Sequence, residues 1–149
     1  MVQPPAAQAR GTAPQRDLVD QFRLAGDLTK PLRTLSGGTR QKVNAVLAFL
    51  FTPSLLILDE PTAGLDPIAS GVLKDKIRQE REEGRTFILT SHVMSELEEL
   101  ADDIVLLLDG SVRFAGSLRD LTARTKQINL ERAVAQLMRE GIGAGSEAA

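Results

Sequence analysis

Apolar and polar residues recur along this chain in helical and in strand-like patterns, and the order of these patterns predicts the fold. Between residues 17 and 30 the apolar positions have helical spacing, and we expect Pro31 to end that helix. After Ser36 and two glycines, a one-sided helical stripe runs as far as Phe51, and Pro53 is expected to end it. The stripe consists of Val43, Val46, Leu47, Leu50 and Phe51.

Strands and helices alternate in the middle of the chain. Leu55–Leu58 is a continuous apolar run, which predicts a strand that is buried on both faces. Asp66 and Pro67 have the residue types of an N-cap and a first helical turn, and the helix that they begin should reach Glu83. Ser91 is expected to cap a further helix. The remaining predicted strands are 86–90 and 104–108. This alternation indicates an α/β fold.

The last part of the chain is predicted to contain a hairpin and two helices. Asp109-Gly110 lies between 104–108 and 112–115 and is typical of a type I′ turn, which predicts an antiparallel pair and hence a mixed sheet. Ser117 should cap the first helix, and an amphipathic stripe that ends at Gly141 predicts the second. The stripe consists of Leu130, Val134, Leu137 and Met138.

These patterns divide the chain into four parts. Residues 1–16 hold three prolines and no apolar run, so we expect a disordered leader there. Residues 17–116 should form the main α/β domain and residues 117–140 a helical extension. Residues 141–149 are predicted to be a disordered tail.

Composition narrows the class of protein. With 149 residues, 42% hydrophobic and 26% charged, the chain has enough apolar surface for one core. Its net charge of -2 gives no global positive field for nucleic acid, although a local basic patch at Arg40 and Lys42 is left open. Cysteine is absent, which excludes disulfide scaffolds and thiolate metal sites. The lack of cysteine also fits a reducing compartment, so we expect a cytoplasmic protein. The longest apolar run, Ala45–Phe51, is far shorter than the roughly 20 residues of a membrane-spanning helix, so we do not expect this chain to cross a membrane.

Two carboxylates follow the predicted strand 55–58. Asp59 and Glu60 would lie at the carboxyl edge of the sheet, where ligands of open α/β folds bind. One carboxylate there could hold Mg²⁺, directly or through its waters, while the next orients or deprotonates an attacking water during phosphoryl transfer. In isolation, two solvated acids in a turn before Pro61 are an equally good interpretation.

Three further segments contain candidate ligand-binding residues. Ser36-Gly37-Gly38 at a helix start could bind a phosphate through main-chain donors, but by itself such a segment is more often an N-cap with loop glycines. His92, the only histidine, follows the strand 86–90 and could touch a γ-phosphate, although a lone histidine at a helix start is usually a surface or capping residue. Gly64–Pro67 by itself is a tight turn with an N-cap.

Taken together, three segments resemble the motifs of one family, the ABC ATPases. LSGGTRQKV at 35–43 is similar to the signature motif, and LLILDEPTAGLDP at 55–67 is similar to Walker B with the D-loop. FILTSHVMSELEELAD at 87–102 is similar to the segment that carries the His-switch. The order and spacing of the motifs fit the family, and the resemblance covers residues 17–116.

In this family, two nucleotide-binding domains face each other head to tail and sandwich two ATP molecules. The resemblance implies that Ser36, Gly37 and Gly38 contact the γ-phosphate of the ATP carried by the opposite subunit. It also implies that Asp66 lies at the dimer seam, as the D-loop aspartate. The implied partner is therefore a second ABC ATPase subunit.

The resemblance assigns catalytic roles to three further residues. Asp59 matches the carboxylate of the Mg²⁺ site, and Glu60 matches the residue that polarises the attacking water. His92 matches the switch histidine that senses the γ-phosphate. The implied cofactors are ATP and Mg²⁺.

The expected fold is a partial P-loop NTPase fold of the ABC type, with a helical signature subdomain and a carboxyl-terminal hairpin followed by helices. No GxxxxGK[ST] phosphate loop occurs in the chain, so we expect an amino-terminally truncated copy that is inactive alone. In the family, the phosphate-loop strand lies between the strands that correspond to 86–90 and 104–108. Its loss would leave unpaired sheet edges, which predicts a marginal or aggregation-prone chain.

The resemblance implies an ATP-binding and ATP-hydrolysing subunit of an ABC transporter, paired with a transmembrane permease at the cytoplasmic face of the membrane. Within the family, Arg33–Asp66 is similar to the copper-processing transporter ATPase of nitrous oxide reductase maturation. One alternative is a non-catalytic fragment that only pairs with an intact ABC ATPase subunit. Another is half of a DNA-repair-type ABC ATPase, but no sustained heptads precede Leu35 and the acidic balance does not favour nucleic acid as a partner.

Overall fold

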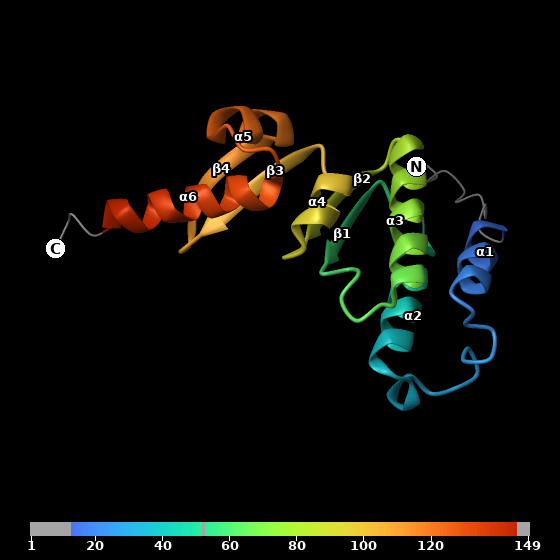
Figure 1. Cartoon of the computed structure of the whole chain (residues 1–149). Coiled ribbons are helices and arrows are strands. Elements are labelled where there is room, and N and C mark those ends of the chain that lie inside the picture. Colours follow the sequence, from blue (N-terminus) through green and yellow to red (C-terminus); the bar gives the residue numbers. More distant parts are fainter. Residues whose placement is uncertain (1–12, 52, 146–149) are drawn as a thin grey trace, which may run out of the picture. The chain divides into compact units, whose positions relative to one another are not determined.

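The computed structural model of the chain describes residues 13–51 and 53–145, which fall into two compact units, Met1–Thr90 and Ser91–Ala149. Helices and strands alternate within both units (Figure 1), as the α/β prediction required. The boundary between the units does not coincide with the end of the main domain expected at Gly116. Most of the expected leader, residues 1–12, lies outside the described residues.

The first unit contains helices packed against a two-stranded parallel sheet. Its elements are α1 (Ala13–Gln21), the 3₁₀ turn η1 (Leu32–Thr34), α2 (Gly37–Phe49), β1 (Leu55–Asp59), α3 (Pro67–Glu82) and β2 (Thr86–Thr90). The two strands are in register, with Leu55 beside Thr86 and Asp59 beside Thr90. The largest buried side chains of this unit come from α1, its following turn, α2, β1 and α3, and they include Leu18, Phe22, Leu24, Phe49, Leu56, Leu73 and Ile77.

The sheet of the first unit is covered on one face only. Leu56 is buried, and the ring of Phe87 lies 6.2 Å from that of Phe49 on α2, so this face packs on the helices. On the opposite face, 46% of Leu55, 70% of Ile57 and 52% of Ile88 are exposed. The prediction that strand 55–58 is buried on both faces is therefore wrong, because no described residue of this unit covers the second face. We call Leu55, Ile57 and Ile88 the open face.

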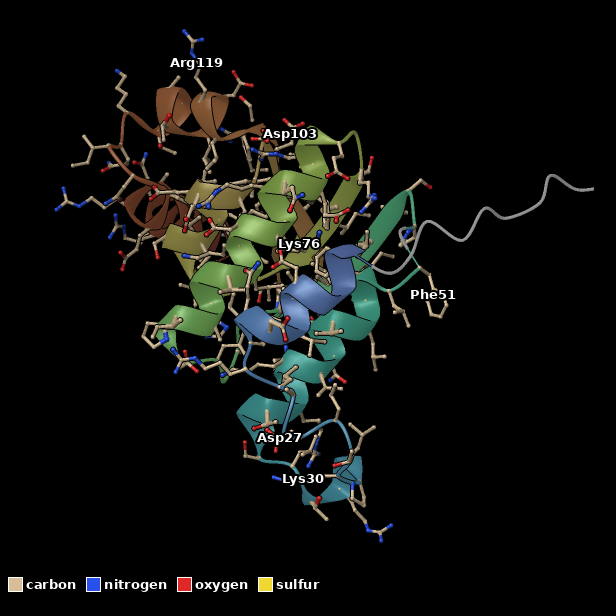
Figure 2. All side chains as sticks on the ribbon, turned by 90° about the vertical axis from the view of Figure 1, so that its right-hand side faces the viewer. Asp27, Lys30, Phe51, Lys76, Asp103 and Arg119 are labelled. Atoms are coloured by element: carbon tan, nitrogen blue, oxygen red, sulfur yellow. The ribbon has the colours of Figure 1, made fainter. Side chains whose placement is uncertain are left out.

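A buried ion-pair cluster fixes the carboxyl-terminal end of α3. Glu80 is only 3% exposed, its carboxylate lies 2.5 Å from the Lys76 ammonium, and the Arg85 guanidinium pairs with the same carboxylate. Lys76 projects from α3 (Figure 2). Its ammonium lies 6.0 Å from the centroid of the Phe49 ring, which joins α3 to α2. Burial lowers the pKa of the Lys76 amino group, as expected when an ammonium is removed from water.

The second unit consists of an antiparallel hairpin with three helices. Its elements are α4 (Met94–Leu100), β3 (Asp103–Leu108), β4 (Ser111–Ser117), α5 (Leu118–Thr125) and α6 (Leu130–Gly145). Asp109 and Gly110 have φ values of +50° and +72°, so the type I′ turn predicted at this pair is confirmed. The core of this unit joins one face of the hairpin to α5 and α6, and it consists of Ile104, Phe114, Leu121, Leu130, Ala133, Val134 and Leu137.

Each unit holds its own sheet, so the mixed sheet predicted around the hairpin is not formed. β1 pairs only with β2, and β3 pairs only with β4, among the strands in the described part of the chain. The resemblance implies a phosphate-loop strand between these pairs, and the described residues form no fifth strand. This gives a physical reason for the separation, since strands pair only when they are direct neighbours.

Helix ends differ from the prediction at both ends of the chain. α1 begins at Ala13, inside the expected leader, and it ends at Gln21 rather than at Pro31. It ends early because Arg23 adopts φ +56° while its N–H and that of Leu24 bond back to Asp20 and Val19, a Schellman cap. At the other end, α6 continues to Gly145, so the tail expected from Gly141 is helical over its first five residues.

Two capping predictions near the second unit had different outcomes. Ser117 caps α5, since its Oγ accepts a hydrogen bond from the Asp120 N–H at 3.1 Å, which confirms the prediction. Ser91 does not cap α4, whose N-cap position is Val93. The Ser91 hydroxyl instead accepts from the Val93 N–H at 3.0 Å, so it stabilises the turn before the helix.

Replacing Asn129 by Ala should destabilise the second unit by about 1 kcal/mol, because Asn129 caps α6. Its Oδ1 accepts from the Arg132 N–H at 3.0 Å, and alanine would leave that donor without an acceptor. Urea unfolding followed by circular dichroism measures the change. Asn129→Asp is the matched control, because it keeps the acceptor and should change stability far less. Equal losses in both variants would contradict the capping role.

Candidate nucleotide-binding site

Asp59 ends β1 on the open face of the first sheet. Because β1 and β2 run parallel in register, Asp59 lies beside Thr90, and the Thr90 hydroxyl donates a hydrogen bond to the Asp59 carboxylate. The Asp59 side chain remains exposed. A carboxylate at the carboxyl end of a parallel strand, held by a neighbour and open to solvent, can ligate a hard cation.

Glu60 follows directly, in an unusual main-chain conformation. Its φ is +45°, a left-handed value that costs a residue with a Cβ about 1–2 kcal/mol. The surroundings compensate: the Glu60 N–H donates to the Thr90 carbonyl at 3.1 Å and to the Thr90 hydroxyl at 3.2 Å. The Glu60 carbonyl accepts from the Gln41 amide at 3.4 Å. These contacts hold the main chain in a sharp turn at the end of the strand.

Ser36, Gly37 and Gly38 form the start of α2, as predicted. The Ser36 Oγ accepts from the Thr39 N–H at 3.1 Å and is the N-cap of this helix. Ser36 and Gly37 are exposed. The helix start therefore presents main-chain donors and the positive end of the helix dipole to solvent, an arrangement that binds phosphate.

The loop between β1 and α3 packs closely on α2 at Gly38. A Cβ placed on Gly38 would lie 2.8 Å from the Gly64 carbonyl oxygen, whereas a Cβ on Gly37 would meet nothing within 4 Å. The absence of a side chain at Gly38 thus permits a close approach of two main-chain segments. The approach connects the signature segment with the D-loop segment of the same chain.

Two side chains of α2 reinforce this approach. The Gln41 amide donates to the Pro61 carbonyl at 3.0 Å, and the Lys42 ammonium lies 2.8 Å from the Asp66 carboxylate. Asp66 also caps α3, since its second oxygen accepts from the Ala69 N–H at 2.8 Å. The first turns of α2 and the loop 60–66 are therefore held as one assembly, which we call the signature–D-loop clamp.

Arg40 and Lys42, the local basic patch that the sequence suggested, both have partners within the chain. Lys42 pairs with Asp66, and the Arg40 guanidinium donates to the Leu35 carbonyl at 3.4 Å. Both cations thus stabilise the signature segment itself.

The Lys42–Asp66 pair predicts a pH dependence of stability. The Lys42 hydrogen bond, aided by that of Ala69, holds the pKa of Asp66 below its ordinary value of 3.8. The Asp66 carboxylate therefore binds a proton more readily in the unfolded chain than in the folded chain. The stability that the pair contributes is fully present above pH 3.8 and is lost as the pH falls through the pKa of the folded state. The unfolding free energy is measured as the pH is lowered from about 5. Asp66→Asn keeps an N-cap, and it should make the decrease of this free energy less steep. Lys42→Met should flatten this decrease in part, because the Ala69 N–H still lowers the pKa of Asp66. A curve unchanged in both variants would contradict the pairing.

His92 is the one predicted site residue in the second unit. It is exposed and lies in the turn between β2 and α4, two residues after Thr90. The first unit thus contains the other predicted residues: Ser36, Gly37, Gly38, Asp59, Glu60 and Asp66.

Sequence reasoning missed Gln41 and Thr90, which contact the predicted site residues directly. Gln41 is four residues after Gly37, so helical spacing places it one turn further along α2 on the same side. Thr90 ends a strand of the same length as β1, and a polar residue at both strand ends was a usable signal for an in-register parallel pair. For Gly64 the sequence predicted only a tight turn, and the close approach of its carbonyl oxygen to Gly38 was missed.

The donor set fits a magnesium ion that is held mainly by substrate. Within residues 13–51 and 53–145 there is no cluster of three or more His, Cys, Asp or Glu side chains suited to a metal ion. Mg²⁺ usually takes only one or two carboxylates, with waters and phosphate oxygens as its other ligands, and Asp59 can supply one. A pocket between α2, β1 and α3, lined by Gln41 and Asp59 among others, measures about 190 Å³, which is too small for a nucleotide.

Comparison with known proteins gives the family. The family model "AAA domain, putative AbiEii toxin, Type IV TA system" matches residues 15–98. ATP-binding cassette sub-family A member 13 of Homo sapiens is 37% identical over 108 residues, which are 72% of this chain and 2% of that protein. The ABC transporter ATP-binding protein NatA of Bacillus subtilis (strain 168) is 31% identical over 115 residues, 76% of this chain and 47% of NatA. The chain therefore spans about half the length of this bacterial relative.

A solved structure agrees with these relatives. The ATP-binding subunit of an ABC transporter superposes with a TM-score of 0.78 at 32% identity, over 82% of this chain and 52% of that subunit. The expected α/β fold, which represents part of an ABC ATPase domain, is confirmed. In the described parts of the chain, no helix has the length and apolar character needed to cross a membrane. By its matching family model, its relatives and its fold, the chain belongs to the family of ABC transporter ATP-binding proteins.

Proposed function

We propose that the chain provides the signature, Walker B, D-loop and His-switch residues of an ATP-hydrolysing ABC transporter subunit, and that an amino-terminal half-domain outside these 149 residues provides the phosphate loop. The observation that carries this proposal is the signature–D-loop clamp. Gly38 approaches Gly64, Gln41 bonds to Pro61, and Lys42 pairs with Asp66, so residues of three motifs keep a fixed geometry. Such pre-organisation suits a site whose catalysis depends on positioning.

Each group has a role that follows from its position. The exposed start of α2, with Ser36, Gly37 and Gly38, receives the γ-phosphate of an ATP bound to the partner. Asp59 ligates Mg²⁺, which neutralises charge on the phosphate oxygens when it is bound. Glu60 orients and deprotonates the attacking water, and His92 contacts the γ-phosphate.

Asp66 has a second role beyond capping α3. It is exposed and lies in the clamp, and we assign it to the dimer seam, where it would meet the partner subunit. Proteins of this class work in pairs with a transmembrane permease, and we place this chain at the cytoplasmic face of the membrane for that reason. The transporter names of the relatives favour this assignment over a role in DNA repair. The similarity to the copper-processing ATPase stays a prediction.

The open face supports the need for a further half-domain that covers it. Leu55, Ile57 and Ile88 form an apolar surface beside the Asp59 carboxylate. Apolar sheet faces of this kind are normally covered, because their exposure to water costs free energy. The sequence has no GxxxxGK[ST] run, and the relative NatA is about twice as long as the matched segment. We assign the open face to an amino-terminal half-domain of an ABC ATPase, which carries the phosphate loop.

Association of the two polypeptides tests this proposal. The chain and an amino-terminal half-domain that carries GxxxxGK[ST] are mixed with ATP and Mg²⁺, and sedimentation velocity measures the complex. We expect association with the native chain and its loss with Ile57→Asp, which places a charge on the open face. Val105→Asp is the matched control, because Val105 is 61% exposed on a strand of the second unit. Absence of a complex, with both polypeptides folded, would contradict the proposal.

A non-catalytic role is the second candidate, and the missing GxxxxGK[ST] run favours it. In that case the chain would pair its signature segment with an intact ABC ATPase subunit and hydrolyse no ATP itself. Association with an intact subunit, combined with no complex with the half-domain, would identify this role.

A further inference from the structure

The hydroxyl of Thr90 contacts both acidic residues of the site at once. A threonine hydroxyl has one hydrogen to donate and two lone pairs to accept with. Thr90 donates that hydrogen to the Asp59 carboxylate and accepts the Glu60 N–H at 3.2 Å. The in-register pairing of β1 and β2 places this hydroxyl between the two residues.

The contact with Asp59 affects the direction of a carboxylate that is otherwise open to water. Asp59 is exposed, so solvent alone would let its side chain populate several rotamers. A hydrogen bond to a charged acceptor is stronger than one between neutral groups, so the Thr90 hydroxyl favours one rotamer of Asp59. This restraint fixes the position that the Asp59 carboxylate oxygens take relative to the sheet, and hence the position of a cation that they would bind.

The contact with Glu60 acts on the main chain. Glu60 has φ +45°, and the direction of its side chain depends on keeping that strained conformation. The Thr90 carbonyl and the Thr90 hydroxyl both accept a hydrogen bond from the Glu60 N–H. Any residue at position 90 would provide the carbonyl, but only a residue with a hydroxyl provides the second acceptor. Asp59 and Glu60 are thus oriented by the same side chain.

We propose that Thr90 is a positioning residue, which orients the Asp59 carboxylate and the Glu60 main chain for hydrolysis. This inference rests on the proposed function of the site. Thr90 acts through its neighbours, so its loss should lower turnover and leave nucleotide binding intact. A purely structural role predicts something different: valine fills the same space and suits a strand equally well, so Thr90→Val would then change nothing.

The kinetic test uses the chain mixed with the amino-terminal half-domain. Thr90→Val should lower kcat by about 10- to 100-fold with KM nearly unchanged, since a charged hydrogen bond of about 1.5–3 kcal/mol is lost. Thr90→Ser retains the hydroxyl and should restore most of kcat. Thr86→Val is the matched control, because Thr86 lies in the same strand at the opposite end, beside Leu55. A normal kcat for Thr90→Val, or a serine variant as slow as the valine variant, would overturn the inference.

A second measurement is independent of activity. Carbon-13 and nitrogen-15 spectra of the chain alone report the Asp59 carboxyl carbon and the Glu60 amide. Thr90→Val should shift both signals, whereas Thr90→Ser and Thr86→Val should leave them near their native positions. Unshifted signals in Thr90→Val would overturn the inference even in an active mixture. An inactive native mixture together with the expected shifts would contradict the proposed function while supporting the orienting role of Thr90.

Discussion

Replacing Glu60 by Gln should lower the rate of ATP hydrolysis by the chain and the amino-terminal half-domain by about 10²- to 10⁴-fold. Glutamine has nearly the same shape but cannot accept a proton from the attacking water. The main-chain anchors of Glu60, at Thr90 and Gln41, do not involve its side chain and should persist. Release of inorganic phosphate measures the rate, and sedimentation shows whether the complex still forms.

Glu82→Gln is the matched control for this prediction. Glu82 is an exposed carboxylate at the end of α3, outside the signature–D-loop clamp, and the same chemical change there should leave the rate unaltered. If Glu60→Gln hydrolysed ATP at the native rate, another group would have to activate the water, and the role given to Glu60 would be wrong.

Replacing Gly38 by Ala should destabilise the chain by about 1–3 kcal/mol, the usual cost of forcing extra volume into a packed contact. The added Cβ would lie 2.8 Å from the Gly64 carbonyl oxygen, and both partners are main chain, so neither can rotate away. The start of α2 must then move away from the D-loop segment. We therefore also expect a loss of ATP hydrolysis when the variant is mixed with the amino-terminal half-domain. Denaturant unfolding and phosphate release measure the two effects.

Gly37→Ala provides the contrast for stability. Its Cβ would meet nothing within 4 Å, and glycine in a helix is less favourable than alanine by roughly 0.5–1 kcal/mol. The two adjacent substitutions should therefore change the unfolding free energy in opposite directions. Equal stability of both variants would show that the approach of Gly38 to Gly64 does not restrain the chain.

Local signals in the sequence predicted much of the fold. The caps at Ser36, Asp66 and Ser117 and the turn at Asp109-Gly110 depend on residues within three or four positions, and all four are present in the structure. The two carboxylates after β1 and the exposed helix start at Ser36 were found in the same way. Each of these features depends only on the types of a few neighbouring residues, which the sequence shows directly.

Features that depend on distant residues could not be predicted. Arg23 ends α1 in a left-handed conformation without glycine or asparagine as a signal. The exposure of Ile57 depends on what covers the sheet, and an apolar run is the same for a covered and an open face. The buried Glu80 carboxylate is paired with Arg85 from the next segment, which ordinary helix patterning cannot anticipate.

The site shows the same division. Residue types at Asp59, Glu60 and the signature glycines indicated the chemistry, but the clamp that joins them is tertiary. Gln41 and Thr90 act across 20 and 31 positions, on Pro61 and Asp59, and only the folded chain brings them to their partners.

The central claim is that this chain completes an ATP-hydrolysing site together with a half-domain that carries the phosphate loop. Its most direct test is Mg-ATP hydrolysis by the chain alone, by the amino-terminal half-domain alone and by their mixture, with phosphate release as the readout. We expect hydrolysis only in the mixture, and its loss with Glu60→Gln. Hydrolysis by the chain alone, or none in a mixture of two folded polypeptides, would contradict the account.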